Sequence, residues 1–204
     1  MKTNRLSGNE LFEFHQTSQG QSVKDFWAWA LSRLLMDGPR GDLAEYIVRM
    51  ALGEDLETPK RGWGECDIKD RGGFRIEVKC SSLLQEWERD KLSAPTFSIA
   101  ETMECDIGGT EGNYHYVGRK GTTKERRSDA YVFCLFACDN REIANPLNLD
   151  QWEFWVVPTD LLNQKMGKRK SVTPATLKKL GIEMIKYDKL AEAVAAIKAE
   201  KRNS

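Results

Sequence analysis

One segment limits the possible folds of this chain more than any other: an almost continuous apolar run from Ala130 to Ala137, with polar residues on both sides of it. A strand that is apolar on both faces is typical of the centre of a sheet that is covered on both sides, as in α/β proteins. Helical periodicity before and after the run can supply the covering layers. The sequence therefore predicts an α/β fold with this segment as its central strand.

Periodicity and breaking residues predict the other elements. Ser22 with Asp25 three residues later resembles a capping box, so a helix is expected over 22–36, ended by Asp37-Gly38-Pro39. The stretch over 88–128 is long and largely polar, and its glycine-rich section from Gly108 to Gly121 is expected to be a mobile loop. The remaining expected elements are a helix over 41–52, a hairpin over 64–82, strands over 97–99, 152–157 and 182–185, and helices beginning at 159, 173 and 188.

The distribution of charge is uneven along the chain. The 204 residues include 31 basic and 31 acidic side chains, which excludes a uniformly basic nucleic-acid coat. Residues 163–204 nevertheless carry 11 basic and 4 acidic groups, which fits either a bound polyanion or a solvated, lysine-rich helix face. We expect one domain over 1–204, with its core at about 22–160 and a basic helical part over 161–204.

Nothing in the sequence predicts a membrane association. The longest apolar runs fall far short of the roughly 20 residues that cross a bilayer, and no apolar segment of a secretory signal follows the polar N-terminus. Cysteine occurs five times, an odd number, and no two have the two-residue spacing of a zinc knuckle. We therefore expect a cytoplasmic protein.

The hairpin over 65–79 carries the residues that are most informative about function. Its second strand alternates between apolar and charged residues, which puts Glu77 and Lys79 on one face. If the hairpin turns at Gly72, Asp67 lies opposite Glu77, because both are five residues from the turn. The sequence therefore predicts two carboxylates on facing strands, with Cβ atoms about 5 Å apart.

Two carboxylates in that position repel each other, so a positive charge should compensate them. Lys79 can do part of this. A hard divalent cation does it better, because Mg²⁺ binds carboxylate oxygens and retains several waters. The alternative is a solvent-exposed hairpin with ordinary ion pairs, since charged strand faces are common. The spacing alone leaves both interpretations open.

Asp67, followed ten residues later by Glu77-Val78-Lys79 on a hairpin that comes after a helix bearing Glu45, resembles the PD-(D/E)XK nuclease superfamily. The resemblance covers about 41–87 and departs from the usual pattern at Cys66, where a proline is common. It implies a restriction-endonuclease-like core, in which a mixed β-sheet is flanked by helices. It also implies a helix after the strand that bears the Glu-x-Lys motif.

The resemblance implies a role for each residue of the motif. Asp67 and Glu77 would hold Mg²⁺, or Mn²⁺ in its place, with the backbone carbonyl of Val78 completing the site. The cation would polarise the scissile phosphate and activate a water. Lys79 would orient that water or stabilise the charge that grows on the phosphoryl oxygens.

Two further residues follow from the resemblance. Glu45 would add a ligand from the preceding helix, although an i,i+4 pair with Arg49 explains this glutamate equally well. Gln85, six residues after Lys79, matches a position where a glutamine approaches the active site in many members of the superfamily. Both are expected to lie near the two carboxylates.

A basic cluster precedes the apolar run. Arg126 and Arg127, together with Arg119 and Lys120, are expected to contact phosphate groups of nucleic acid. The alternative is a charged entrance to the strand with no ligand. No helix-turn-helix, zinc finger or stacking motif specifies a target sequence.

The residues and the resemblance together predict a Mg²⁺-dependent endonuclease that hydrolyses phosphodiester bonds of double-stranded DNA. One alternative is a non-catalytic nucleic-acid-binding or assembly module that retains the nuclease fold. Another is a nuclease acting on RNA or branched nucleic acid, because the metal site contacts only phosphate. A homodimer is a further hypothesis, since cutting both strands of a duplex commonly uses two copies of such a site.

Overall fold

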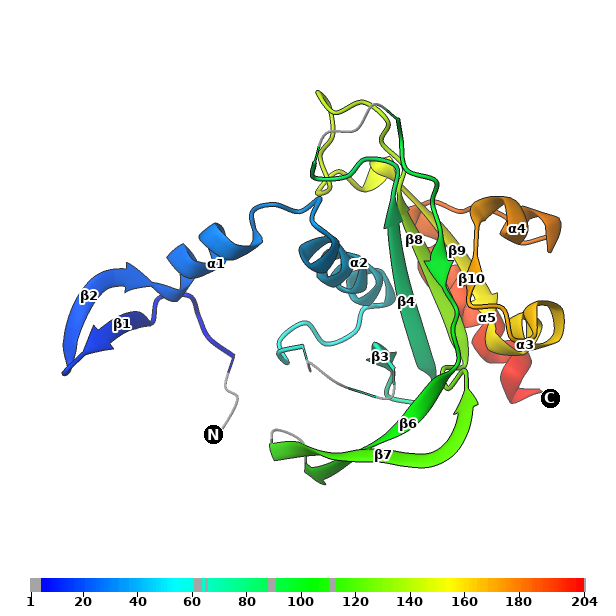
Figure 1. The fold of residues 1–204 in the computed structure, drawn as a ribbon, viewed down its shortest axis with the longest axis horizontal. Helices are drawn as coiled ribbons and strands as arrows, with labels where there is room; N and C mark the ends of the chain where they lie inside the picture. Colours follow the sequence, from blue (N-terminus) through cyan, green and yellow to red (C-terminus); the bar gives the residue numbers. More distant parts are fainter. Residues whose placement is uncertain (1–4, 61–63, 65, 88–90, 111–112, 204) are drawn as a thin grey trace.

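The computed structural model describes residues 5–60, 64, 66–87, 91–110 and 113–203, and within 104–122 it describes the backbone alone. The chain has the α/β fold that its sequence predicts, built on a four-stranded mixed sheet with strand order β3-β4-β8-β9 (Figure 1). The strands of this sheet are β3 (Ile68–Lys69), β4 (Arg75–Ser82), β8 (Ala130–Phe136) and β9 (Trp152–Pro158).

The apolar run forms the central strand, as expected. All seven residues of β8 are buried. β8 pairs in parallel with β4 on one side and antiparallel with β9 on the other, while β3 pairs antiparallel with β4 at the edge of the sheet. This position explains the lack of polar residues in β8, because both faces of a central strand contact a covering layer.

Alternate residues of β8 face two apolar clusters, one on each side of the sheet. Val132 and Cys134 belong to the cluster formed with α2 and α5, whereas Tyr131 and Phe133 belong to the cluster formed with α3 and α4. The helices are α2 (Asp37–Leu52), α3 (Thr159–Met166), α4 (Pro174–Lys179) and α5 (Leu190–Arg202), with short 3-10 turns at Leu149–Gln151 and Tyr187–Lys189. Among the described residues, no helix is long and apolar enough to cross a membrane.

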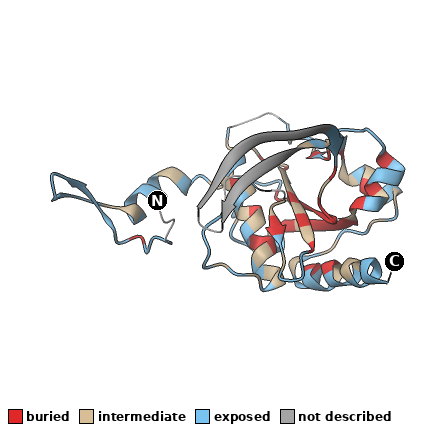
Figure 2. Cartoon of the chain, turned by 90° about the horizontal axis from the view of Figure 1, so that it is seen from below, coloured by how far each residue is buried: buried red, intermediate tan, exposed pale blue. Residues whose placement is uncertain are grey.

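Residues 5–31 form an extension that we call the N-terminal arm. It consists of β1 (Leu11–Phe14), β2 (Thr17–Ser22) and α1 (Val23–Leu31), and it projects from the body of the molecule (Figure 1). Figure 2 shows that the arm is largely exposed, whereas buried residues gather in the sheet and on the helix faces that cover it. Residues of α3, α4 and α5, which lie beyond residue 158, therefore contribute to the hydrophobic core. The helix α1 has no buried residue and contributes none, although the core was expected at about 22–160.

The N-terminal boundary of α1 is confirmed and its C-terminal boundary is not. Ser22 and Asp25 form the expected capping box. However, α1 ends at Leu31, and Asp37-Gly38-Pro39 begins α2 instead of ending α1. Proline suits the first turn of a helix, because its missing N–H would have no helical partner there.

The loop expected in the glycine-rich section over 108–121 is wrong, apart from 111–112, which lie outside the described residues. After β5 (Phe97–Ser98), which pairs with β10 (Ser171–Val172), the strands β6 (Thr102–Thr110) and β7 (Asn113–Glu125) form a long antiparallel hairpin. Glycines weaken a strand, but pairing of the backbone groups outweighs this cost here. The strand expected over 182–185 is reduced to one bridge between Ile185 and Phe154.

Asp129, just before β8, connects three segments. Its carboxylate accepts hydrogen bonds from the backbone N–H of Arg75 at 2.7 Å and from Nζ of Lys201 at 2.5 Å. Burial raises the pKa of this carboxyl, but the hydrogen bonds from Arg75 and Lys201 outweigh burial and bring the pKa to about 2. Asp129 is therefore a structural residue that joins β4, β8 and α5.

We expect the contribution of Asp129 to stability to disappear in acid. Its pKa of about 2 lies below the ordinary value of 3.8, so the ionised carboxyl stabilises the fold at neutral pH and loses that effect as the pH falls towards 2. Urea unfolding of the parent and of Asp129→Asn should differ by about 2 kcal/mol at about pH 6 and by much less at about pH 2.5. An equal difference at both pH values would contradict this role.

Candidate active site

The β3–β4 hairpin has the register that the sequence predicts. Ile68 lies opposite Ile76 and Lys69 opposite Arg75, so that the same register continued by one residue places Asp67 opposite Glu77. A turn over Asp70–Phe74 sets this register. Within it, Oδ1 of Asp70 accepts the backbone N–H groups of Gly72 and Phe74, and Gly73 adopts a φ of 83°, which favours glycine.

Asp67 is fixed from both sides. Its Oδ2 accepts the backbone N–H of Val78 at 2.7 Å, and its main-chain carbonyl accepts Nη2 of Arg49 at 2.7 Å. The first contact ties the carboxylate to β4 and the second ties the backbone to α2. Asp67 therefore has a defined position beside β4 although it precedes the two residues of β3.

Glu77 and Lys79 share one face of β4 and form an ion pair. Nζ of Lys79 lies 2.5 Å from Oε1 of Glu77, and the hydroxyl of Ser128 donates to Oε2 of Glu77 at 3.1 Å. Tyr131, the neighbour of Glu77 in the parallel register with β8, is buried. Burial, followed by the charge of Glu77, raises the pKa of Tyr131 to about 12, and Asp67 adds to this effect. Glu77 and Asp67 are thus both electrostatic neighbours of the same phenol.

Glu45 approaches the same region from α2. Nζ of Lys60 donates to Oε1 of Glu45 at 2.7 Å and to Oδ1 of Asp42 at 2.5 Å. Burial raises the pKa of Glu45, the hydrogen bond from Lys60 opposes it, and the negative charge of Asp67 raises it further. The structure therefore brings Glu45 near Asp67, but with Lys60 as its direct partner.

Carboxylate oxygens, such as those of Asp67 and Glu77, are the ligands that a hard divalent cation prefers. Among the described residues, no group of three or more His, Cys, Asp and Glu side chains could hold a metal ion, and the ligand role of Glu45 stays a prediction. Mg²⁺ needs only one or two carboxylates and completes its shell with water and phosphate. Within the described part of the chain, Oδ1 of Asp67 accepts no hydrogen bond, which leaves one carboxylate oxygen for a cation.

The structure does not bring Gln85 to the two carboxylates. The helix expected after β4 is wrong, since the described residues between β4 and β8 contain no helix. Gln85 lies three residues beyond the end of β4, where its side-chain amide donates to the hydroxyl of Ser93 at 3.0 Å. Nη2 of Arg141 also binds its main-chain carbonyl, at 2.8 Å. These contacts hold Gln85 beyond the C-terminal end of β4, whereas Glu77 lies near the N-terminal end of that strand.

The expected contact between Arg126 and nucleic acid is wrong. The side chain is buried, and its guanidinium donates to the carbonyls of Ile99, Gly167 and Arg169 at 2.7, 2.8 and 2.9 Å, and to Oδ1 of Asn163 at 2.8 Å. Four of the five N–H donors of an arginine are therefore used inside the protein. Arg126 connects the segment before β8 to β5 and to the end of α3.

The other three basic residues of the expected interface have different positions. Nη1 of Arg127 lies 2.5 Å from Oε1 of Glu125, so an acidic neighbour partly neutralises its charge. Arg119 and Lys120 belong to β7, but their side chains lie outside the described residues. Phosphate contacts by these three residues stay predictions.

Three residues near the carboxylates were not expected from the sequence. Ser128 reaches Glu77 across 51 positions, and Lys60 and Arg49 reach Glu45 and Asp67 across 15 and 18 positions. Ser128 is placed by the parallel register between β4 and β8, which no local pattern in the sequence indicates. Arg49 had a local signal as the i,i+4 neighbour of Glu45, but its hydrogen bond goes to Asp67 instead.

No protein-family model matches the chain, and no curated protein matches it in sequence. Within the chain itself, Asp67 and Glu77, with Lys79 beside Glu77, form the candidate site.

Proposed function

We propose that this protein is a divalent-metal-dependent nuclease that hydrolyses phosphodiester bonds in DNA, with a site of the PD-(D/E)XK type. The observation that carries the proposal is the register of the β3–β4 hairpin, in which Asp67 faces Glu77 while Lys79 lies beside Glu77 on the same face. Two carboxylates and a lysine at the edge of a mixed sheet are the groups that metal-assisted hydrolysis of a phosphate ester requires.

Each residue has a defined part in this reaction. A bound divalent cation supplies Lewis-acid polarisation of the phosphate and lowers the pKa of a bound water. Asp67 and Glu77 hold the cation, and the N–H of Val78 keeps the Asp67 carboxylate in place. Lys79 lies within hydrogen-bond distance of Glu77 and stabilises the charge that develops on the phosphoryl oxygens. Water gives up one proton to solvent as its oxygen bonds to phosphorus, the bond from phosphorus to the leaving oxygen breaks, and a proton from solvent neutralises that oxygen.

A second function is favoured by a different observation. Both carboxylate oxygens of Glu77 are engaged, one by Lys79 and one by Ser128, and Lys60 holds Glu45. Such a network is satisfied without a metal, as it would be in a non-catalytic module that binds nucleic acid or a partner protein. The two functions differ in one property, because only the nuclease converts its ligand.

A panel of substrates separates these possibilities. The full chain is incubated with supercoiled plasmid, linear duplex, single-stranded DNA and RNA, in Mg²⁺ or Mn²⁺ and in excess chelator. The nuclease proposal expects metal-dependent cleavage of at least one DNA substrate. Cleavage that persists in chelator would contradict the metal mechanism, and binding without cleavage of any substrate would favour the non-catalytic module.

Lys79→Ala separates catalysis from metal binding. We expect Mn²⁺ affinity to stay equal or to increase, because a competing positive charge beside Glu77 is removed. Single-turnover cleavage should fall about 10²-fold, as is usual when one preorganised charge stabiliser is lost. Lys69→Ala, on the facing strand β3, is the matched control and should cleave at the parent rate. Cleavage by Lys79→Ala at the parent rate would contradict the role of Lys79.

A further inference from the structure

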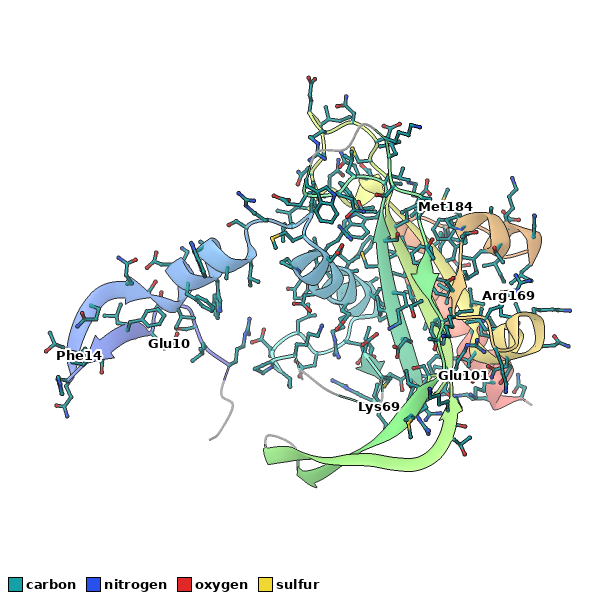
Figure 3. The ribbon with its side chains drawn as sticks, viewed as in Figure 1. Glu10, Phe14, Lys69, Glu101, Arg169 and Met184 are labelled. Carbon is teal, nitrogen blue, oxygen red and sulfur yellow. The ribbon has the colours of Figure 1, made fainter. Side chains whose placement is uncertain are left out.

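The N-terminal arm presents an aromatic surface that the described part of the chain leaves open. None of the residues of α1 is buried. Phe14, labelled in Figure 3, lies at the tip of the arm, far from the body. The exposed fractions of the five aromatic side chains are 48% for Phe12, 67% for Phe14, 47% for Phe26, 37% for Trp27 and 83% for Trp29. Exposed aromatic surface on this scale marks an interaction site.

Two ion pairs join the N-terminal arm and the residues just after it to the body. Arg5 pairs with Glu57, and Arg33, just after α1, pairs with Glu86 at 3.4 Å. Ion pairs with at least one solvent-exposed partner contribute little to stability. The aromatic side chains of the arm are therefore available to another surface.

The linker between α1 and α2 directs the arm away from the body. Leu35 packs against the core cluster on the α2 side of the sheet, and the buried guanidinium of Arg40 donates to the carbonyl of Leu35. The same guanidinium binds Asp37 at 2.5 Å. This anchoring leads α1 away from its own α2 (Figure 1), so the arm does not fold back onto that helix.

A second apolar surface lies on the outer face of α2. Ala44, Ile47 and Val48 of this helix face the core, whereas Tyr46 and Met50 are exposed. Together with the half-buried Pro39, they form a stripe with successive spacings of seven and four residues, while Leu43 at its border packs against the core cluster. That spacing is typical of a face against which another helix packs. The outer stripe of α2 is thus a suitable surface for a short aromatic helix such as α1.

Charge and area favour a second copy of the chain as the partner. The N-terminal arm carries two basic groups, Arg5 and Lys24, and three acidic groups, Glu10, Glu13 and Asp25, so no excess positive charge attracts nucleic acid or an anionic membrane. At about 200 Å² per aromatic side chain, the exposed fractions leave about 550 Å² open on each arm. If each arm buries half of that area, the two arms and the two surfaces that they cover bury about 1,100 Å² in total. This total is enough for a specific interface.

We propose that the protein forms a homodimer by exchange of arms, in which α1 of each copy packs its aromatic side chains on the outer stripe of α2 in the other copy. The interface is symmetric and closed, because each copy gives one arm and receives one. The proposal is independent of the nuclease activity, since it uses none of the residues of the candidate site.

Complementary charge substitutions test this pairing by sedimentation velocity of the full chain. The parent should be a dimer. Trp29→Glu and Tyr46→Arg should each weaken the dimer by about thirtyfold or more, as expected for an aromatic residue at the centre of an interface. Ile143→Glu, at an exposed apolar residue on a loop, is the control and should leave the dimer unchanged. Because Trp29 and Tyr46 are exposed, thermal unfolding should show that both variants remain folded.

Mixing the two variants gives the decisive result. In a mixed dimer, one interface pairs the new carboxylate of Trp29→Glu with the new guanidinium of Tyr46→Arg, and the other interface is that of the parent. An equimolar mixture should therefore recover dimers that neither variant forms alone. A monomeric parent at about 100 μM would overturn the proposal, because the dissociation constant of the proposed dimer must lie below that concentration. A mixture that stays monomeric would overturn the pairing of the arm with α2.

Discussion

Asp67→Asn and Glu77→Gln are each expected to reduce metal-dependent cleavage by about 10³-fold or more, because loss of a carboxylate ligand removes several kcal/mol of stabilisation of the phosphate transition state. The folded structure should persist in both variants. The amide that Asp67→Asn introduces keeps an oxygen that can accept the N–H of Val78, which Oδ2 of Asp67 accepts at 2.7 Å in the parent. Single-turnover cleavage at saturating substrate measures the loss, and urea unfolding in the absence of metal measures stability.

The control for this prediction is Glu142→Gln, at an exposed position on the loop between β8 and β9. It should cleave at the parent rate. If Asp67→Asn or Glu77→Gln instead lowered the free energy of unfolding by several kcal/mol and spared cleavage, the carboxylates would be structural partners and the nuclease proposal would be wrong.

Arg126→Ala is expected to destabilise the fold by about 3–5 kcal/mol, the usual cost of leaving buried partners of a charged group without it. The substitution would leave three carbonyls and the Asn163 side chain without their donor. Arg126→Lys should recover only part of this loss, because an ammonium lacks the planar fork of donors. Urea unfolding measures both variants.

Arg169→Ala is the matched control for Arg126. Its side chain is exposed, as Figure 3 illustrates, while its backbone carbonyl still accepts Arg126 after the substitution. The control should change the free energy of unfolding by less than about 0.5 kcal/mol. If Arg126→Ala changed the free energy of unfolding by as little as Arg169→Ala does, the structural role of Arg126 would be contradicted and the phosphate-binding interpretation would be restored.

The part of the candidate site that could be predicted is the part whose geometry depends on residues close together in the sequence. Asp67 and Glu77 belong to one hairpin, and alternation together with a turn at Gly72 suffices to set their register. The central strand could be predicted equally well, because burial on both faces of β8 requires an uninterrupted run of apolar residues. In both cases the cause lies within about 15 residues of sequence.

The errors occurred where the determining contacts are distant in sequence. Arg126 and Arg127 are adjacent residues of the same type, so the sequence does not distinguish them. Arg126 is nevertheless buried, and its hydrogen-bond partners near β5 and α3 are 27–43 positions away in the sequence. The glycine-rich stretch looks like a loop until β6 and β7 are seen to pair. Gln85 was expected on a helix after β4, but contacts with Ser93 and Arg141 hold a chain without helical structure there.

Calorimetric titration of Mn²⁺ into the metal-free full chain determines whether Asp67 and Glu77 share one divalent cation, on which the proposed function depends. The parent should bind one ion per chain. Asp67→Asn and Glu77→Gln should each weaken that binding by about tenfold or more, and Glu142→Gln should bind like the parent. Equal Mn²⁺ affinity in the parent and in both carboxylate variants would contradict a shared cation.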